Sequence, residues 1–158
     1  MKTLGNLMFD GINYILCKVI HANKEVDNIM ELTPEEIDKL IDYYGIKGVI
    51  LDIDETIRFD MNEISEETNL WLDMILSKLK VIVVSNGYDK KIQEQLDNKG
   101  IIYINLAFKP LKRGFIKACE LLELNPSEVM VIGDDIFSDI YGGKRNKMVT
   151  VKVNSLKK

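Results

Sequence analysis

Continuous apolar runs alternate with amphipathic segments along most of this chain. From residue 48 onward, short runs rich in Val and Ile place apolar side chains at successive positions rather than at every second one. This pattern is typical of strands that are covered on both faces, as in a parallel sheet. The predicted strands span residues 48–54, 80–85, 101–105, 128–134 and 148–153.

The segments between these strands have the periodicity of amphipathic helices. They lie near residues 65–79, 88–98, 111–123 and 136–145. Crossovers between parallel strands are right-handed in nearly all proteins, so alternating strands and helices place helices on both faces of the sheet. We therefore expect a three-layer, doubly wound α/β/α fold with a Rossmann-like central parallel sheet.

Two helices are predicted before the first strand. The second begins after Thr33, which can cap it, places Pro34 at its first position, and ends at Gly45. The first has an apolar face made of Leu4, Leu7, Met8, Ile12, Ile15, Leu16, Val19 and Ile20. Such a face can pack on a core, contact a second copy of the chain or lie on a membrane surface. The sequence leaves these alternatives open.

Composition and charge narrow the class of protein. The 158 residues, 46% of them hydrophobic, suit one domain over 1–158, with an N-terminal helical segment at 1–46 and an α/β core at 47–158. The formal charge of −4, from 25 acidic and 21 basic residues, disfavours general nucleic-acid binding. No apolar stretch reaches the ~20 residues of a membrane span, and two distant cysteines with one histidine form no zinc pattern. We expect a cytoplasmic protein.

Polar side chains able to carry out chemistry follow the predicted strands. They are Asp52 and Asp54 after the first strand, Ser85 and Asn86 after the second, Lys109 after the third, and Asp134, Asp135 and Asp139 after the fourth. In open α/β sheets, ligands bind at the carboxyl ends of the strands, so these side chains should converge. Taken singly, each has a structural explanation. Asp135 and Asp139 could cap a helix, and Ser85 and Asn86 could form an ordinary turn.

Taken together, these residue types favour phosphoryl chemistry. Carboxylates from two neighbouring strands concentrate negative charge, which is costly unless a cation is bound, and oxygen ligands suit Mg²⁺. A lysine and a serine beside the cation could hold a phosphoryl group. One carboxylate could then attack phosphorus while another transfers protons.

Four segments occur in the order of a known motif set. DIDET, VIVVSNG, Lys109 within FKP, and VIGDDIFSD resemble the motifs of the haloacid dehalogenase (HAD) superfamily of aspartate-nucleophile phosphatases. LTPEEIDKLIDYYGIKGVILDIDET and the GG of DIYGGKRN also resemble the capless subfamily IIIA branch of YqeG-type phosphatases, which is similar to phosphatidylglycerophosphate phosphatases. The intervals from Asp52 to Ser85 and from Ser85 to Lys109 are filled by predicted elements, so no cap domain is expected.

The resemblance implies a catalytic role for three residues. Asp52 would be the nucleophile that forms an aspartyl phosphate. Asp54 would protonate the leaving oxygen and then activate water. Lys109 would neutralise the charge of the phosphate and of the nucleophile. A receiver domain uses similar groups, but its acidic pair precedes a phosphorylated aspartate on a later strand, so the order argues against it. A HAD-fold binding module without turnover is the other alternative, although it would be expected to lack one of these three residues.

Further residues are implied as ligands. Mg²⁺ would be held by Asp52, Asp54 and Asp134, and the phosphoryl oxygens by Ser85, Asn86 and Lys109, with Thr56, Asp135 and Asp139 in support. The chain departs from the branch pattern at Glu55, where Asn is usual, and at Lys144 and Lys147, which replace the Asn and the last Gly of GGNRxG. An uncapped site is open to large phosphorylated substrates, such as a lipid headgroup in a membrane, unless a second copy of the chain covers it.

Overall fold

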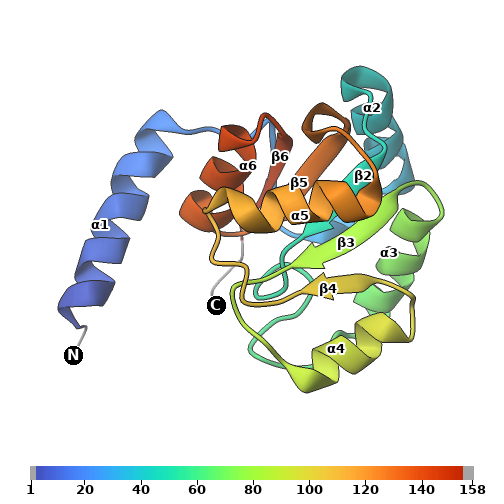
Figure 1. The fold of residues 1–158 in the computed structure, drawn as a ribbon, viewed down its shortest axis with the longest axis horizontal. Helices are drawn as coiled ribbons and strands as arrows, with labels where there is room; N and C mark the ends of the chain where they lie inside the picture. Colours follow the sequence, from blue (N-terminus) through green and yellow to red (C-terminus); the bar gives the residue numbers. More distant parts are fainter. Residues whose placement is uncertain (1–2, 155–158) are drawn as a thin grey trace.

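A six-stranded parallel sheet forms the centre of the computed structural model, which describes residues 3–154 (Figure 1). The strand order is β1-β6-β5-β2-β3-β4. The strands are β1 (Lys24–Val26), β2 (Gly48–Leu51), β3 (Lys80–Val84), β4 (Ile102–Ile104), β5 (Val129–Gly133) and β6 (Val149–Val153). The chain runs from β2 outward to β4 on one side and resumes at β5 on the other. The order of the strands therefore switches at β2, whose carboxyl end is the expected place for a site.

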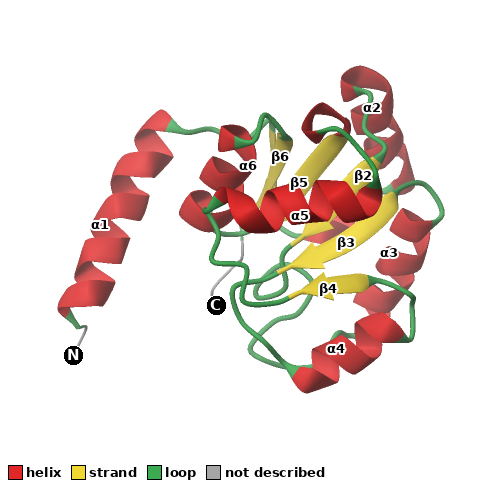
Figure 2. Ribbon diagram, in the orientation of Figure 1, coloured by secondary structure: helices red, strands yellow, loops and turns green. Residues whose placement is uncertain are grey.

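Helices cover both faces of this sheet, as the sequence predicted (Figure 2). They are α1 (Leu4–Val19), α2 (Pro34–Tyr44), α3 (Glu66–Leu76), α4 (Lys90–Asp97), α5 (Lys112–Leu122) and α6 (Gly142–Arg145), with short helical turns η1 (Ile29–Glu31), η2 (Pro126–Glu128) and η3 (Ile136–Tyr141). Among the described residues, only α3 lies between β2 and β3 and only α4 between β3 and β4. No cap domain is therefore inserted at either place.

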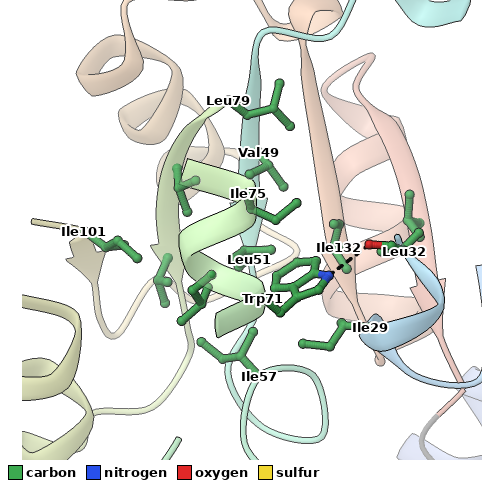
Figure 3. Close-up of a cluster of buried hydrophobic side chains, with 14 of the residues drawn as sticks. Ile29, Leu32, Val49, Leu51, Ile57, Trp71, Ile75, Leu79, Ile101 and Ile132 are labelled. Atoms are coloured by element: carbon green, nitrogen blue, oxygen red, sulfur yellow. Dashed lines mark hydrogen bonds between the residues drawn. The ribbon is translucent and has the colours of Figure 1, made fainter. Parts of the chain in front are cut away.

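Two separate apolar cores result from the alternation of side chains along each strand. Val49 and Leu51 of β2 point to the core beneath α2, α3 and α4, whereas Ile50 points to the core beneath α5. Figure 3 shows the first core, in which the Trp71 indole of α3 lies among aliphatic side chains. Its Nε1 donates a hydrogen bond to the Leu32 carbonyl oxygen at 3.1 Å, which ties α3 to the segment between η1 and α2.

The edge strand β1 was not predicted. The sequence pattern indicated only helices before residue 47, but Lys24–Val26 pairs in parallel with β6. Only Val26 of the three residues is buried, so the segment lacks the apolar run that identified the other strands. The preceding residue, Asn23, fixes this edge because its Oδ1 accepts hydrogen bonds from the Thr150 backbone N–H and hydroxyl, at 2.9 and 3.1 Å.

Helix α1 projects beside the α/β body and contacts it through η3 (Figure 1). It is continuous through Gly11 and capped by Thr3, whose hydroxyl accepts a hydrogen bond from the Asn6 N–H. Most of the predicted apolar face is solvent-exposed, so it is not part of the core: Leu4, Leu7, Met8, Ile12, Ile15 and Val19. Between residues 3 and 154, no helix combines the length and apolarity needed to cross a membrane.

Candidate active site

The carboxyl ends of β2 and β5 bring the central acids together. These strands are neighbours, and the Asp52 N–H extends their pairing by donating to the Ile132 carbonyl oxygen at 3.0 Å. Strand β2 ends at Leu51 rather than at the predicted residue 54, so Asp52 and Asp54 lie just beyond the ladder. Carboxylate oxygens of Asp52, Asp134 and Asp139 lie within 4.8 Å of one another.

Lys109 is the cation of this cluster. Its buried Nζ donates to Asp52 Oδ1 at 2.7 Å and to Asp139 Oδ1 at 2.6 Å. Burial by itself lowers the pKa of Lys109, but the charges of Asp139 and Asp52 outweigh burial and raise that pKa above its usual value. Lys109 is therefore a fixed positive charge that joins the ends of three segments.

One lysine does not balance three acids. Burial, followed by repulsion from Asp139 and Asp52, raises the pKa of Asp134 to about 8. The pKa of Asp139 is also raised, by burial and then by the charge of Asp52. A divalent cation would remove this excess negative charge, and oxygen donors are the ligands that Mg²⁺ prefers. The carboxylate oxygens of Asp52 and Asp134 therefore fit a hard cation as ligands, whereas Asp139 accepts a hydrogen bond from Lys109.

Asp134→Asn should stabilise the metal-free protein at high pH. The folded-state pKa of Asp134 lies above the unfolded value of 3.8, so the folded protein holds a proton that is lost as pH rises to about 8, and stability falls over that window. An amide carries no such charge. At pH 8.5 with chelator, we expect the free energy of unfolding of the variant to exceed that of the unsubstituted protein by at least ~1 kcal/mol. Near pH 3.5 we expect no difference between the two. Urea unfolding measures this.

Magnesium provides the second arm of that experiment. Added Mg²⁺ should stabilise the unsubstituted protein at pH 8.5 and have little effect on Asp134→Asn, because the substitution removes a carboxylate ligand. Asp42→Asn, an exposed acid on α2, serves as the control. Equal destabilisation of Asp134→Asn at both pH values would contradict the repulsion that the geometry indicates.

The turn after β3 brings Ser85 and Asn86 to the cleft and positions Lys109. The Ser85 side chain is buried, and its Oγ accepts from the Gly87 N–H at 3.1 Å. Both polar atoms of the Asn86 side chain bond the Lys109 backbone: Oδ1 accepts from its N–H at 2.6 Å, and Nδ2 donates to its carbonyl oxygen at 3.0 Å. Asn86, predicted as a phosphate ligand, thus fixes the lysine segment in this structure.

Asp54 has partners that the sequence did not reveal. Arg58 is almost fully buried and donates through Nε to Asp54 Oδ1 at 2.7 Å and through a terminal nitrogen to Asp89 Oδ2 at 2.6 Å. The hydrogen bond from Arg58 lowers the pKa of Asp89, which also caps α4. The side chain of Asp54 remains half exposed at the cleft. Arg58 therefore orients an acid that is still open to solvent. In the sequence, an arginine four positions after Asp54 is only a weak signal of this contact. The contact with Asp89 could not be predicted, because it depends on how two loops approach each other.

The turn after β5 explains the GDDxxxD spacing. Asp135 caps η3, since its Oδ1 accepts from the N–H groups of Phe137 and Ser138 at 2.9 and 2.6 Å. The helix predicted over 136–145 begins as a π-helical turn, in which the Ile140 N–H donates to the Asp135 carbonyl oxygen at 3.2 Å. Asp139, fully buried on this turn, points to Lys109. Such turns are frequent at functional sites.

Two further residues shape this environment. A Cβ on Gly133 would overlap the Asp139 carboxyl group, so only glycine allows that approach. Thr56 is fully buried, and its hydroxyl oxygen has no hydrogen-bond partner among the described residues. Seven of the predicted site residues line one cleft of about 280 Å³, whereas Thr56 and Asp139 are buried and do not line it. Its lining residues are Phe9, Asp52, Asp54, Ser85, Asn86, Gly87, Lys109, Asp134, Asp135, Phe137 and Ser138.

Sequence comparison identifies the family. Residues 72–146 match the model for haloacid dehalogenase-like hydrolases. A longer match joins the chain to "Probable phosphatase YqeG" of Bacillus subtilis (strain 168), at 30% identity over 141 residues, covering 88% of this chain and 80% of that protein. The chain belongs to the haloacid dehalogenase-like hydrolases. The segment matched by the family model, residues 72–146, contains Ser85, Lys109 and the acids that follow β5, whereas Asp52 and Asp54 precede it.

Solved structures share this HAD fold at low sequence identity. An uncharacterized protein from Listeria monocytogenes serotype 4b aligns with a TM-score of 0.56 at 21% identity, over 69% of this chain and 79% of its own. A structure from Legionella pneumophila described as a HAD subfamily III A hydrolase aligns with a TM-score of 0.50 at 19% identity, over 65% of this chain and 63% of its own. At these sequence identities, the similarity to both structures shows a shared fold alone.

Two departures from the HAD branch pattern occur at strained backbone positions. Glu55, where Asn is usual in the branch, has φ of 57°, and Lys147, where Gly is usual, has φ of 59°. Asn and Gly tolerate this left-handed region, whereas other residues carry a cost of roughly 1–2 kcal/mol. Glu55 and Lys147 therefore add strain at these two positions. Glu55 Oε1 accepts a hydrogen bond from the Asp60 N–H at 3.2 Å, which holds the loop.

Lys147→Gly should therefore stabilise the protein. Glycine relieves the positive φ, and we expect the free energy of unfolding to rise by about 0.5–1 kcal/mol in urea titrations. Lys144→Gly is the matched control, because Lys144 lies in α6 and glycine disfavours a helix. Destabilisation by both substitutions would show that Lys147 is not strained.

Proposed function

We propose that this protein is a magnesium-dependent phosphomonoester hydrolase that passes through an aspartyl phosphate on Asp52. The observation that carries the proposal is the cluster in which Lys109 bonds both Asp52 and Asp139 while Asp134 lies within ligand distance and Ser85 closes the same cleft. The relative in Bacillus subtilis is named a probable phosphatase, which supports the same reaction.

In the first half of the reaction, a carboxylate oxygen of Asp52 attacks phosphorus and the bond from phosphorus to the alcohol oxygen breaks. Protonated Asp54, held by Arg58 at the cleft, gives its proton to the departing alcohol oxygen. Lys109 and the turn at Ser85 stabilise the negative charge of the phosphoryl oxygens. The products of this half are the free alcohol and phosphorylated Asp52.

In the second half, water attacks the phosphorus of the aspartyl phosphate. Asp54, now a carboxylate, takes a proton from this water, and the bond between phosphorus and Asp52 breaks. Inorganic phosphate leaves, and Asp54 is protonated again. Asp52, Asp134 and, as the family resemblance implies, the backbone carbonyl of Asp54 would hold Mg²⁺, which would supply positive charge to the phosphoryl oxygens when bound.

Arg58→Ala should lower kcat about tenfold or more, with a smaller change in KM. Without the guanidinium, Asp54 loses the contact that orients it for both proton transfers. Steady-state kinetics with a soluble phosphate ester measure this, and Arg113→Ala, an exposed arginine on α5, is the control. A normal kcat in folded Arg58→Ala would mean that Asp54 needs no positioning by Arg58.

A lipid phosphate such as phosphatidylglycerophosphate is the leading substrate that we propose. An uncapped cleft admits a large headgroup, and the loops after β2, β3 and β4 carry exposed apolar side chains: Met61, Tyr88, Leu106 and Phe108. Together with the exposed apolar face of α1, these side chains support a peripheral contact with a membrane from the cytoplasmic side.

Phosphate release from two substrates tests the reaction and the substrate separately. We would compare p-nitrophenyl phosphate with phosphatidylglycerophosphate in mixed micelles, each with Mg²⁺ and with chelator. Magnesium-dependent release with strong preference for the lipid is the expected result. Release only from p-nitrophenyl phosphate would contradict the lipid assignment, and release from neither by folded protein would contradict the hydrolase proposal for these esters.

A further inference from the structure

Two aromatic rings form an apolar wall on an otherwise polar cleft. Phe9 of α1 and Phe137 of η3 line the same cleft as Asp52 and Lys109, and the other lining residues are polar or glycine. Phe137 belongs to the turn that carries Asp139, whereas Phe9 comes from a helix that precedes the whole sheet. Neither ring is needed for the steps at phosphorus described above.

The two rings are held by contacts with each other and with η3. The Phe9 and Phe137 rings meet edge to face, with centroids 6.3 Å apart and an interplanar angle of 86°. Phe137 also stacks on Tyr141 at 5.9 Å, and the Arg145 guanidinium lies 5.5 Å from the Tyr141 ring. Ring contacts thus link the two wall residues to η3 and α6, and aromatic pairs of this kind prefer fixed orientations.

Phe9 lies on the side of α1 that faces the body. Asn13, Leu16 and Ile20 recur at helical spacing from Phe9, and these three are partly buried, whereas the flanking residues of the helix are exposed. The Phe9 residue itself is 44% exposed. Because the ring contacts Phe137 and still has free surface at the cleft, it can contact a bound molecule without a change in the fold.

We propose that Phe9 and Phe137 form a subsite for the alcohol part of the substrate and that this subsite takes an apolar portion of that alcohol, alkyl or aryl. The inference rests on the proposed function, because the polar end of the cleft must hold the phosphoryl group. The rings offer no hydrogen-bond donor or acceptor, so affinity comes from apolar area removed from water. Each buried methylene group contributes up to about fourfold in affinity.

Binding of phosphonates tests this subsite without turnover, because their carbon–phosphorus bond replaces the ester bond. Calorimetry with Mg²⁺ would compare methylphosphonate with hexylphosphonate. We expect the protein to bind hexylphosphonate about tenfold more tightly, and we expect Phe9→Ala to reduce that preference to about threefold or less. Phe9→Trp should retain the preference, and methylphosphonate should bind all variants within about twofold.

Leu7→Ala is the matched control, since Leu7 is an exposed apolar residue on the same helix and does not line the cleft. An unchanged preference in Phe9→Ala, or an equal loss in Leu7→Ala, would overturn the subsite. Tight binding of methylphosphonate with no gain for hexylphosphonate would overturn the subsite and leave the proposed function standing. Binding of neither phosphonate, together with no release of phosphate from any ester, would overturn both.

Discussion

Asp52→Asn should abolish phosphate release from every ester and leave the fold intact. The amide cannot act as the nucleophile, and we expect kcat to fall roughly 10³-fold or more. The substitution also removes one of three crowded carboxylates, so the free energy of unfolding without metal should stay the same or rise. Phosphate release and urea unfolding measure the two effects, with Asp42→Asn as a charge-matched control distant from the cluster.

Two results would contradict this account of Asp52. Residual turnover near the unsubstituted level would exclude an aspartyl phosphate at this residue. A large loss of stability would indicate that Asp52 is chiefly a structural partner of Lys109. Loss of turnover in a stable protein is the combination that the cluster predicts.

Lys109→Met should remove activity and stability together. The side chain of methionine can fill the same space, but Asp52 and Asp139 would face each other without a cation in a buried site. Removing one partner of a buried ion pair costs about 3–5 kcal/mol. We therefore expect unfolding at a much lower urea concentration, partial recovery of stability with Mg²⁺, and phosphate release below detection.

Lys112→Met is the control for this loss, because Lys112 is exposed three positions along the chain. The control should unfold like the unsubstituted protein. A Lys109→Met protein of normal stability would mean that Asp52 and Asp139 are not both charged in the resting site, so that the lysine balances less negative charge there.

The central fold and the acid cluster were predictable from sequence because each depends on a regular feature. Continuous apolar runs identify β2, β3, β5 and β6, and the carboxyl ends of parallel strands meet at one edge. Asp52 and Asp134 therefore had to be near each other once β2 and β5 were neighbours. The length of each interval between motifs also excluded a cap domain.

Other features depend on contacts that no local pattern records. Strand β1 is short and mostly polar, and it is held by the Asn23 contacts to Thr150. Arg58 reaches Asp54 and Asp89 only because two loops approach each other beyond β2 and β3. The apolar face of α1 was visible in the sequence, but its exposure, and the position of Phe9 at the cleft, required the structure.

Chemical trapping of the intermediate is the measurement that tests the central claim most directly. Protein quenched during turnover would be treated with sodium borohydride, which reduces an acyl phosphate to an alcohol and so converts phosphorylated aspartate to homoserine. Peptide mass spectrometry should find homoserine at Asp52, dependent on substrate and on Mg²⁺. Turnover without homoserine at Asp52, or with homoserine at Asp54 instead, would contradict the account.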